Sequence, residues 1–169
     1  MMGTLTDLLM PPVGPGELLF AFLVGAVSRA VIIGALGFVV IVPFESLPVE
    51  AFWAIFVFGI LGATFMGCLG VLAGLWAEKF DHLAAITNFV ITPLTFLSGT
   101  FYLIERLPEH LQILAHFNPF FYLIDGFRYG FLGQADGSIS VGLVVLLVMN
   151  AVLVITTFAI FRKGWGIKS

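Results

Sequence analysis

The sequence predicts an all-α integral membrane protein that crosses the bilayer several times. Of its 169 residues, 60% are hydrophobic and only 10% are charged, whereas a water-soluble domain carries about 25% charged residues. Four apolar runs, each at least as long as the roughly 20 residues that cross a hydrocarbon core, cover more than half of the chain. Too little remains for a soluble catalytic domain, so we expect residues 1–169 to form a single transmembrane domain.

The four expected transmembrane helices are residues 18–42, 51–77, 83–104 and 139–161. The first run is interrupted only by Arg29. A charge at the centre of a bilayer costs several kcal/mol unless it is paired, which makes Arg29 a candidate functional residue. The alternative is that Arg29 lies near the cytoplasmic surface and extends its guanidinium into the headgroup region.

The basic residues beside the last span predict the orientation of the chain. Arg162, Lys163 and Lys168 follow that span, and basic residues next to a span stay on the cytoplasmic side. We therefore expect a cytoplasmic C-terminus. Residues 1–17 are then a cytoplasmic segment, and residues 105–138 lie outside.

The segment 105–138 is too apolar for an exposed loop and too interrupted to span. Leu107-Pro108-Glu109 has the pattern of a helix start, and Asn118-Pro119 ends that helix and starts another. We predict an external re-entrant helical hairpin that dips into the outer leaflet, in which Asp125 and Arg128 pair at i,i+3. An aromatic belt lying flat at the interface remains the alternative.

A polar stripe on the third predicted span is a candidate substrate path. Asn88, Thr92, Thr95 and Gly99 recur at helical spacing, and Pro93 interrupts the backbone hydrogen bonds beside them. Such a stripe lines a conduit for a polar or amphiphilic substrate, or it hydrogen-bonds a neighbouring helix. Small residues on the second span favour close helix packing over any chemical role; they are Gly59, Ala63, Gly67, Gly70 and Gly74.

Several kinds of function are excluded or disfavoured by what the sequence lacks. No G-x-x-x-x-G-K-[ST] phosphate loop is present, so any ATP hydrolysis belongs to another chain. His82, His110 and His116 are scattered, and the single Cys68 makes neither a disulfide nor a zinc site alone. A net charge of −3 argues against nucleic acid. We expect no catalytic residue, no metal and no cofactor bound by this chain.

Four motifs occur in order in the second half of the chain: Pro93-Leu-Thr-Phe-Leu-Ser-Gly-Thr-Phe-Tyr, Leu107-Pro108, Asn118-Pro119 and Asp125-Gly-Phe-Arg-Tyr-Gly-Phe-Leu-Gly. Together they resemble the C-terminal half of an ABC-2-type permease, the membrane subunit of a bacterial ATP-driven exporter. The resemblance implies that the four spans match the family's third to sixth, with the hairpin between the last two. It also implies a homodimer in the inner membrane, a substrate path along the third span, and an ABC ATPase partner that holds ATP-Mg.

The N-terminal segment is similar to the family's cytoplasmic loop that contacts the ATPase. The resemblance gives this coupling role to Thr6, Asp7, Leu8, Leu9 and Met10. It implies an exporter of a lipid-like, polysaccharide or drug substrate, and the sequence lacks counterparts of the family's first two spans. Two alternatives stay open: an ion-coupled secondary transporter or channel-like protein using Arg29 and the Pro93 break, and a membrane fragment that transports nothing.

Overall fold

Helices joined by short turns and loops make up the part of the chain that the structure describes. The computed structural model describes residues 14–44, 48–77, 80–99, 112 and 115–163, and no strand occurs among them. The helices are α2 (Pro15–Ile41), α3 (Phe52–Trp76), α4 (Phe80–Ile86), the π-helical turn η1 (Thr87–Ile91), α5 (Thr92–Phe96), α7 (Pro119–Leu132) and α8 (Ile139–Lys163). The predicted all-α class is confirmed for these ranges.

Three of the predicted spans appear as helices long and apolar enough to cross a membrane, namely α2, α3 and α8. The prediction of 18–42 for the first was close, but α2 starts at Pro15. Proline is favoured at the first helical position, and the carboxylate of Glu17 accepts the backbone N–H of Gly14 at 3.1 Å. The three helices make the chain a multi-pass membrane protein.

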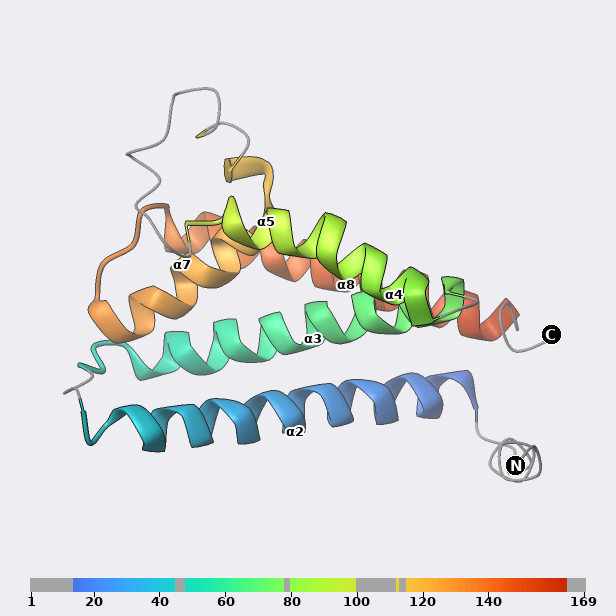
Figure 1. The fold of residues 1–169 in the computed structure, drawn as a ribbon, viewed down its shortest axis with the longest axis horizontal. Coiled ribbons are helices and arrows are strands. Elements are labelled where there is room, and N and C mark those ends of the chain that lie inside the picture. The colour runs from blue at the N-terminus through green and yellow to red at the C-terminus, as the bar shows by residue number, and fades with distance from the viewer. Residues whose placement is uncertain (1–13, 45–47, 78–79, 100–111, 113–114, 164–169) are drawn as a thin grey trace.

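The three long helices lie roughly along the long axis of the molecule (Figure 1). The start of α2 packs against the end of α8, where the rings of Phe22 and Phe161 stack with centroids 6.2 Å apart. We call this the Pro15 end of the bundle. The opposite end, where α3 begins, we call the Ala51 end.

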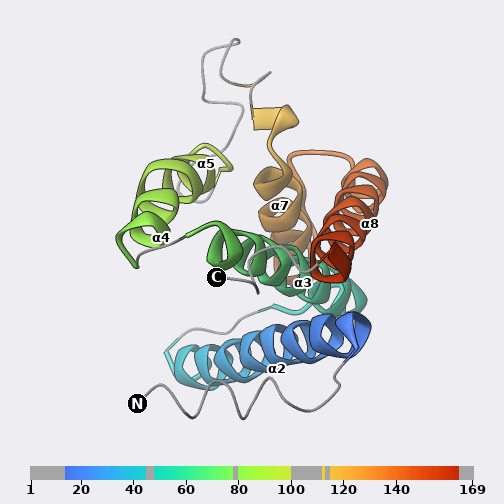
Figure 2. The same cartoon turned by 90° about the vertical axis from the view of Figure 1, so that its right-hand side faces the viewer.

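Helix α3 is the central helix, because it contacts α2, α7 and α8 (Figure 2). Its buried residues include Ala54, Phe58 and Phe65. The ring of Phe65 meets that of Phe120 of α7 edge-on, with centroids 5.6 Å apart. The hydrophobic core therefore lies between α3, α7 and α8, and α2 adds only Leu19 to the buried hydrophobic residues.

The small residues of α3 pack closely against a neighbour at one position in particular. A Cβ atom added to Gly67 would lie 2.9 Å from the Cβ of Ala26 in α2, so only glycine allows this approach. The predicted close packing is confirmed there. Gly70 and Gly74 have no described atom within 4 Å of such a Cβ, so the same reason does not apply to them.

Helix α7 runs antiparallel to α3 along about half of its length. It starts level with Phe65 near the middle of α3, and in its last turn the carbonyl of Gly130 accepts the backbone N–H of Ala51 at 3.0 Å. Asn118 caps the start as predicted, with its side chain accepting from the backbone N–H of Phe120. Gly133 ends the helix with φ of 68°, a conformation that suits glycine.

The fourth predicted span, residues 83–104, is not among the helices that qualify as membrane spans in the described part. Helices α4, η1 and α5 run end to end from residue 80 to 96, and we call this run the 80–96 helix. It ends at Phe96, and residues 100–104 lie outside the described ranges. It comes close to the bundle where α4 meets α3 and α5 meets α7, its Ile91 and Leu94 pack against the hydrophobic core, and it stands to one side (Figure 2).

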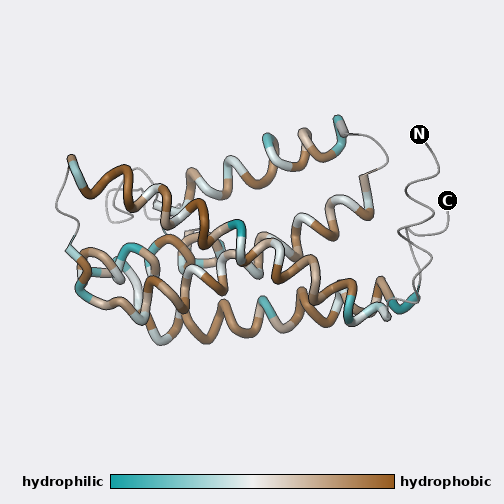
Figure 3. Tube along the Cα trace, turned by 90° about the horizontal axis from the view of Figure 1, so that it is seen from below, coloured by the Kyte–Doolittle hydropathy of each residue, from teal (hydrophilic) through white to brown (hydrophobic). Residues whose placement is uncertain are grey.

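Apolar residues dominate the long helices on every side (Figure 3). Large hydrophobic side chains are exposed along α2, including Phe20, Ile32 and Leu36 at 59–70% exposure. Lipid or further protein must cover such a surface, since soluble proteins rarely expose contiguous apolar patches this large.

Candidate functional site

The 80–96 helix carries most of the residues expected to meet the substrate. Asn88 is exposed, whereas Thr92 and Thr95 are half-buried. The hydroxyl of Thr92 donates to the carbonyl of Thr87, and that of Thr95 donates to the carbonyl of Ile91, both at 2.9 Å. A hydroxyl has a single proton to donate, so both threonines present acceptor lone pairs and methyl groups to their surroundings.

The π-helical turn changes which residues share a face of this helix. Pro93 has no N–H and its ring crowds the carbonyl four residues earlier, so the wider turn just before it relieves the clash. The backbone N–H of Thr92 accordingly donates to Thr87, five residues earlier, and not to Asn88. The α-helical spacing that aligned Asn88 with Thr92 in the sequence does not hold here, and Thr87 takes that place.

Gly99 does not extend the stripe, which corrects the sequence prediction. It lies beyond the end of the helix with φ of 78°, a left-handed conformation that glycine adopts at helix C-termini. Gly99 therefore turns the chain after the helix, and the helical face ends before it.

Asn118 joins the end of the 80–96 helix to the start of α7. Its Nδ2 donates to the carbonyl of Leu94 at 2.6 Å and to Oγ of Ser98 at 2.9 Å. Its Oδ1 accepts from the backbone N–H of Phe120 at 3.1 Å. The capping role was readable from the Asn-Pro dipeptide, whereas the bonds to residues 20 and 24 positions earlier had no local sequence signal.

A charged cluster fixes the other end of α7. Arg128 Nη2 lies 2.7 Å from Asp125 Oδ1, the predicted pair, and also 2.7 Å from Asp136 Oδ2. The carboxylate of Asp125, whose residue is 3% exposed, accepts backbone N–H groups from Asp136 and Gly137 at 2.8 and 2.9 Å. Burial alone would lower the pKa of Arg128, but the bonds and charges of Asp136 and Asp125 raise it above its ordinary value. The third member, Asp136, was not predicted.

Arg29 lies near the middle of α2, about 20 Å along the axis from Pro15 at 1.5 Å per residue. It is exposed, and none of the ion pairs among described residues includes it. Apart from Ser28, whose hydroxyl donates to the carbonyl of Gly25, the helix is apolar around this point, so a functional role for the Arg29 charge remains a prediction. The expected coupling residues Thr6, Asp7, Leu8, Leu9 and Met10 lie outside the described residues.

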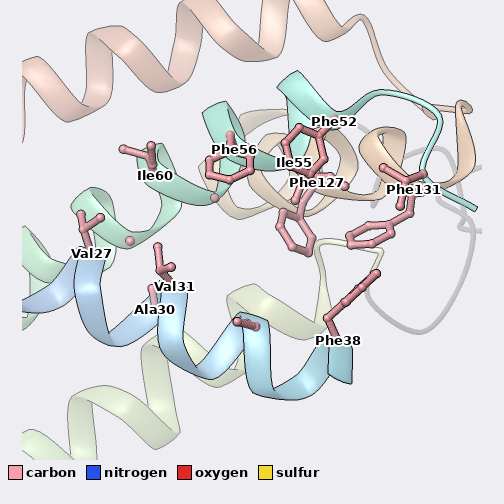
Figure 4. Close-up of a pocket in the computed structure, with 15 residues that line it drawn as sticks. Val27, Ala30, Val31, Phe38, Phe52, Ile55, Phe56, Ile60, Phe127 and Phe131 are labelled. Atoms are coloured by element: carbon pink, nitrogen blue, oxygen red, sulfur yellow. The ribbon is translucent and has the colours of Figure 1, made fainter. Parts of the chain in front are cut away.

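An apolar groove of about 460 Å³ opens between α2, α3 and α7 toward the Ala51 end (Figure 4). Val31 and Phe38 of α2, Phe56 of α3, and Phe127 and Phe131 of α7 line it, and every lining residue is apolar. The groove suits an acyl chain or another apolar helix. It offers no side-chain polar group for the head of an amphiphile.

The described residues contain no cluster of three or more His, Cys, Asp or Glu side chains that would hold a metal ion. Their architecture is that of a polytopic helical membrane protein, with polar groups concentrated on the 80–96 helix and around α7. The chain belongs to the ABC-2 type transporter family, whose model matches residues 1–132.

Two relatives illustrate the match. The chain is 32% identical over 163 residues to the inner membrane transport permease YadH of Escherichia coli (strain K12), which covers 96% of this chain and 64% of the relative. It is 31% identical over 111 residues to nodulation protein J of Rhizobium leguminosarum bv. viciae, covering 66% of this chain and 42% of the relative. The chain thus spans less than two thirds of their length. No solved structure matches it.

Proposed function

We propose that the chain is a membrane subunit of an ATP-binding-cassette exporter in a bacterial inner membrane. The observation that carries the proposal is the family match over residues 1–132, together with three helices suited to crossing a bilayer. ATP binds and is hydrolysed on a separate ATPase chain, and this subunit provides the path for a lipid-like, polysaccharide or drug substrate. Two copies form the path.

In this proposal the 80–96 helix forms the described part of a fourth span and lines the substrate path. Asn88 supports this role, because it is exposed on a helix that makes little contact with the bundle. Thr87 is exposed as well, but its hydroxyl already donates to the carbonyl of Leu83 at 2.9 Å. Facing lipid without a partner, the Asn88 amide would cost about 1–3 kcal/mol, so in this proposal water, substrate or a second copy covers it.

Helix α7 supports the proposal of a re-entrant hairpin. It begins beside Phe65, near the middle of a candidate span, and ends beside Ala51 at the end of that span. Helix α7 therefore covers about half the depth of the bundle, and its C-terminal end lies at the same end of the bundle as the start of α8. This is the placement expected of a segment that dips into one leaflet. The buried ion pairs of Arg128 lower the cost of placing charges there.

The coupling segment is tested by its complex with the ATPase. Co-expressed with the cognate ATPase and any further spans, the chain is expected to form a complex that Asp7→Lys and Leu8→Asp weaken about tenfold or more, because a reversed charge and a buried carboxylate disrupt a mixed interface. Co-purification and affinity measurements check this, with Glu50→Lys as the matched control, since Glu50 is exposed and lies at the Ala51 end of the bundle. Full complex stability in both variants would remove residues 6–10 from the interface. ATP-independent transport would favour the ion-coupled alternative.

The orientation is tested by reporters on either side of α8. A reporter fused after Ser169 is expected to lie in the cytoplasm, since Arg162 and Lys163 end α8, and one inserted at Asp136 is expected to lie outside. Paired alkaline phosphatase and fluorescent protein fusions measure this. Finding both reporters on one side would contradict either the span or the orientation rule.

The substrate path is tested by cysteine accessibility in a Cys68→Ala background of the assembled transporter. Single cysteines at Asn88, Thr92 and Thr95 are expected to react with a small polar thiol reagent, at rates that ATP changes. Cysteines at Val90 and Leu97 serve as controls on other faces and should react more slowly. Equal labelling at all five positions, insensitive to nucleotide, would leave only helix packing as the role of the stripe.

A further inference from the structure

Asn118 occupies a position where one buried side chain caps two helices at once. It is 4% exposed, and both ends of its amide are engaged. The Oδ1 atom accepts the first free N–H of α7, from Phe120, while Nδ2 donates to Leu94 and Ser98 at the end of the 80–96 helix. We call this set of hydrogen bonds the Asn118 link.

The bond to Leu94 replaces a lost helical bond. In a continuing α-helix the N–H of Ser98 would donate to the Leu94 carbonyl, but here it donates to Thr95 at 3.2 Å. The Leu94 carbonyl accepts instead from the Ser98 hydroxyl and from Asn118. The link therefore completes the C-terminus of one helix with the N-terminal residue of another.

The link joins the two elements by side-chain hydrogen bonds from α7 to residues 20 and 24 positions earlier. Among the described helices, α5 neighbours η1 and α7, so a displacement of α5 reaches α7 directly, while the other end of the 80–96 helix meets α3 through α4. Helix α7 is in turn held to α3 at Gly130 and, through Asp125, to residues 136 and 137 just before α8. Asn118 thus stands at the start of a continuous path from the 80–96 helix to α3 and α8.

We propose that Asn118 is a positioning residue that transmits movement of the 80–96 helix to α7 during the transport cycle. The inference rests on the proposed function, in which that helix lines the path and moves with nucleotide. Asn118 touches no substrate in this scheme. It makes α7 follow the helix, because an amide that holds both helix ends gives neither end freedom to shift alone.

Two substitutions separate the link from the cap. Asn118→Ser keeps a hydroxyl that accepts the N–H of Phe120, as serine does at many helix starts, but it is too short to reach Leu94. Asn118→Ala removes both functions. We expect Asn118→Ser to assemble with the ATPase and to keep its thermal midpoint close to that of the unsubstituted protein, whereas Asn118→Ala lowers the midpoint.

The test follows single reporter cysteines in the Cys68→Ala background of the assembled transporter. Phe89, 82% exposed on the 80–96 helix, and Leu132, 53% exposed at the end of α7, are the reporter positions. With Asn118 intact, ATP should change labelling at both by about fivefold or more, the size of an ordinary coupling between sites. In Asn118→Ser the change at position 89 should persist and the change at position 132 should be lost, with transport reduced and ATPase activity retained.

The other labelling results would contradict either the Asn118 link or the proposed substrate path. A change at both positions in Asn118→Ser would overturn the link. In the protein that keeps Asn118, a response at position 89 without one at position 132 would also overturn the link, but it would leave the proposed substrate path intact. No response at either position would contradict both the link and the proposed path. If Asn118→Ser fails to assemble, Ser98→Ala decides: it removes one acceptor of the amide, keeps the α7 cap, and should weaken the response at position 132 alone.

Discussion

Gly130→Ala is expected to lower the stability of the protein strongly. A Cβ at this position would lie 2.9 Å from the backbone nitrogen of Ile55 and 3.3 Å from the carbonyl oxygen of Ala51. These are backbone atoms at the start of α3, so they move only if the helices separate. Overpacking of a tight contact costs about 1–3 kcal/mol or more, and the loss should appear as a drop in the thermal midpoint in detergent.

Gly70→Ala is the matched control for this experiment. Gly70 also lies inside a helix, but no described atom comes within 4 Å of an added Cβ. Alanine is favoured over glycine in a helix interior by about 1 kcal/mol, so the control should be neutral or stabilising. Equal midpoints for the two variants would show that α7 is not held against α3 as closely as the structure has it.

Asp125→Ala should be the second strongly destabilising change. It removes the acceptor for the N–H groups of Asp136 and Gly137 and one of the two carboxylates paired with Arg128. Breaking a buried pair from one side costs about 3–5 kcal/mol, and the partial exposure of Arg128 together with its remaining bond to Asp136 places the expected loss near the lower value.

The measurement is again the thermal midpoint, with Asp81→Ala as the control because Asp81 is exposed near the start of α4. The free energy of unfolding of the control should fall by less than about 1 kcal/mol, the usual limit for the contribution of a carboxylate in the first turn of a helix. Asp125→Asn keeps the shape and part of the accepting capacity, so it should fall between the two. An Asp125→Ala protein as stable as the control would show that the cluster does not hold α7 to the start of α8.

The sequence predicts the features that depend on local composition. The spans that became α2, α3 and α8 are long apolar runs, and the start of α7 follows from the preferences of Asn118 and Pro119 over two adjacent positions. The Asp125–Arg128 pair is likewise a contact within one helical turn. All of these can be read because the residues that determine them are neighbours in the chain.

The features that escaped prediction depend on distant residues or on backbone geometry. Asn118 reaches Leu94 across 24 positions, and Asp136 reaches Arg128 by way of the turn after α7. The wide turn before Pro93 shifts the face of the 80–96 helix by one residue, so Thr87 and not Asn88 precedes Thr92 on that face. A count of helical spacing assumes an undisturbed α-helix, and a proline in mid-helix removes that assumption.

The contact between the first and last described helices bears on how the protein is made. Phe22 stacks on Phe161, and Gly16 lies beside Phe158. This contact of α2 can therefore form only after α8 has been synthesised. At 5–20 residues per second, synthesis separates the two by roughly 7–30 s. During that interval the nascent α2 is held in the bilayer by its own hydrophobicity and by α3 once that emerges. The arrival of α8 therefore closes the Pro15 end of the bundle, and until then the start of α2 lacks the partner that it packs against in the folded structure.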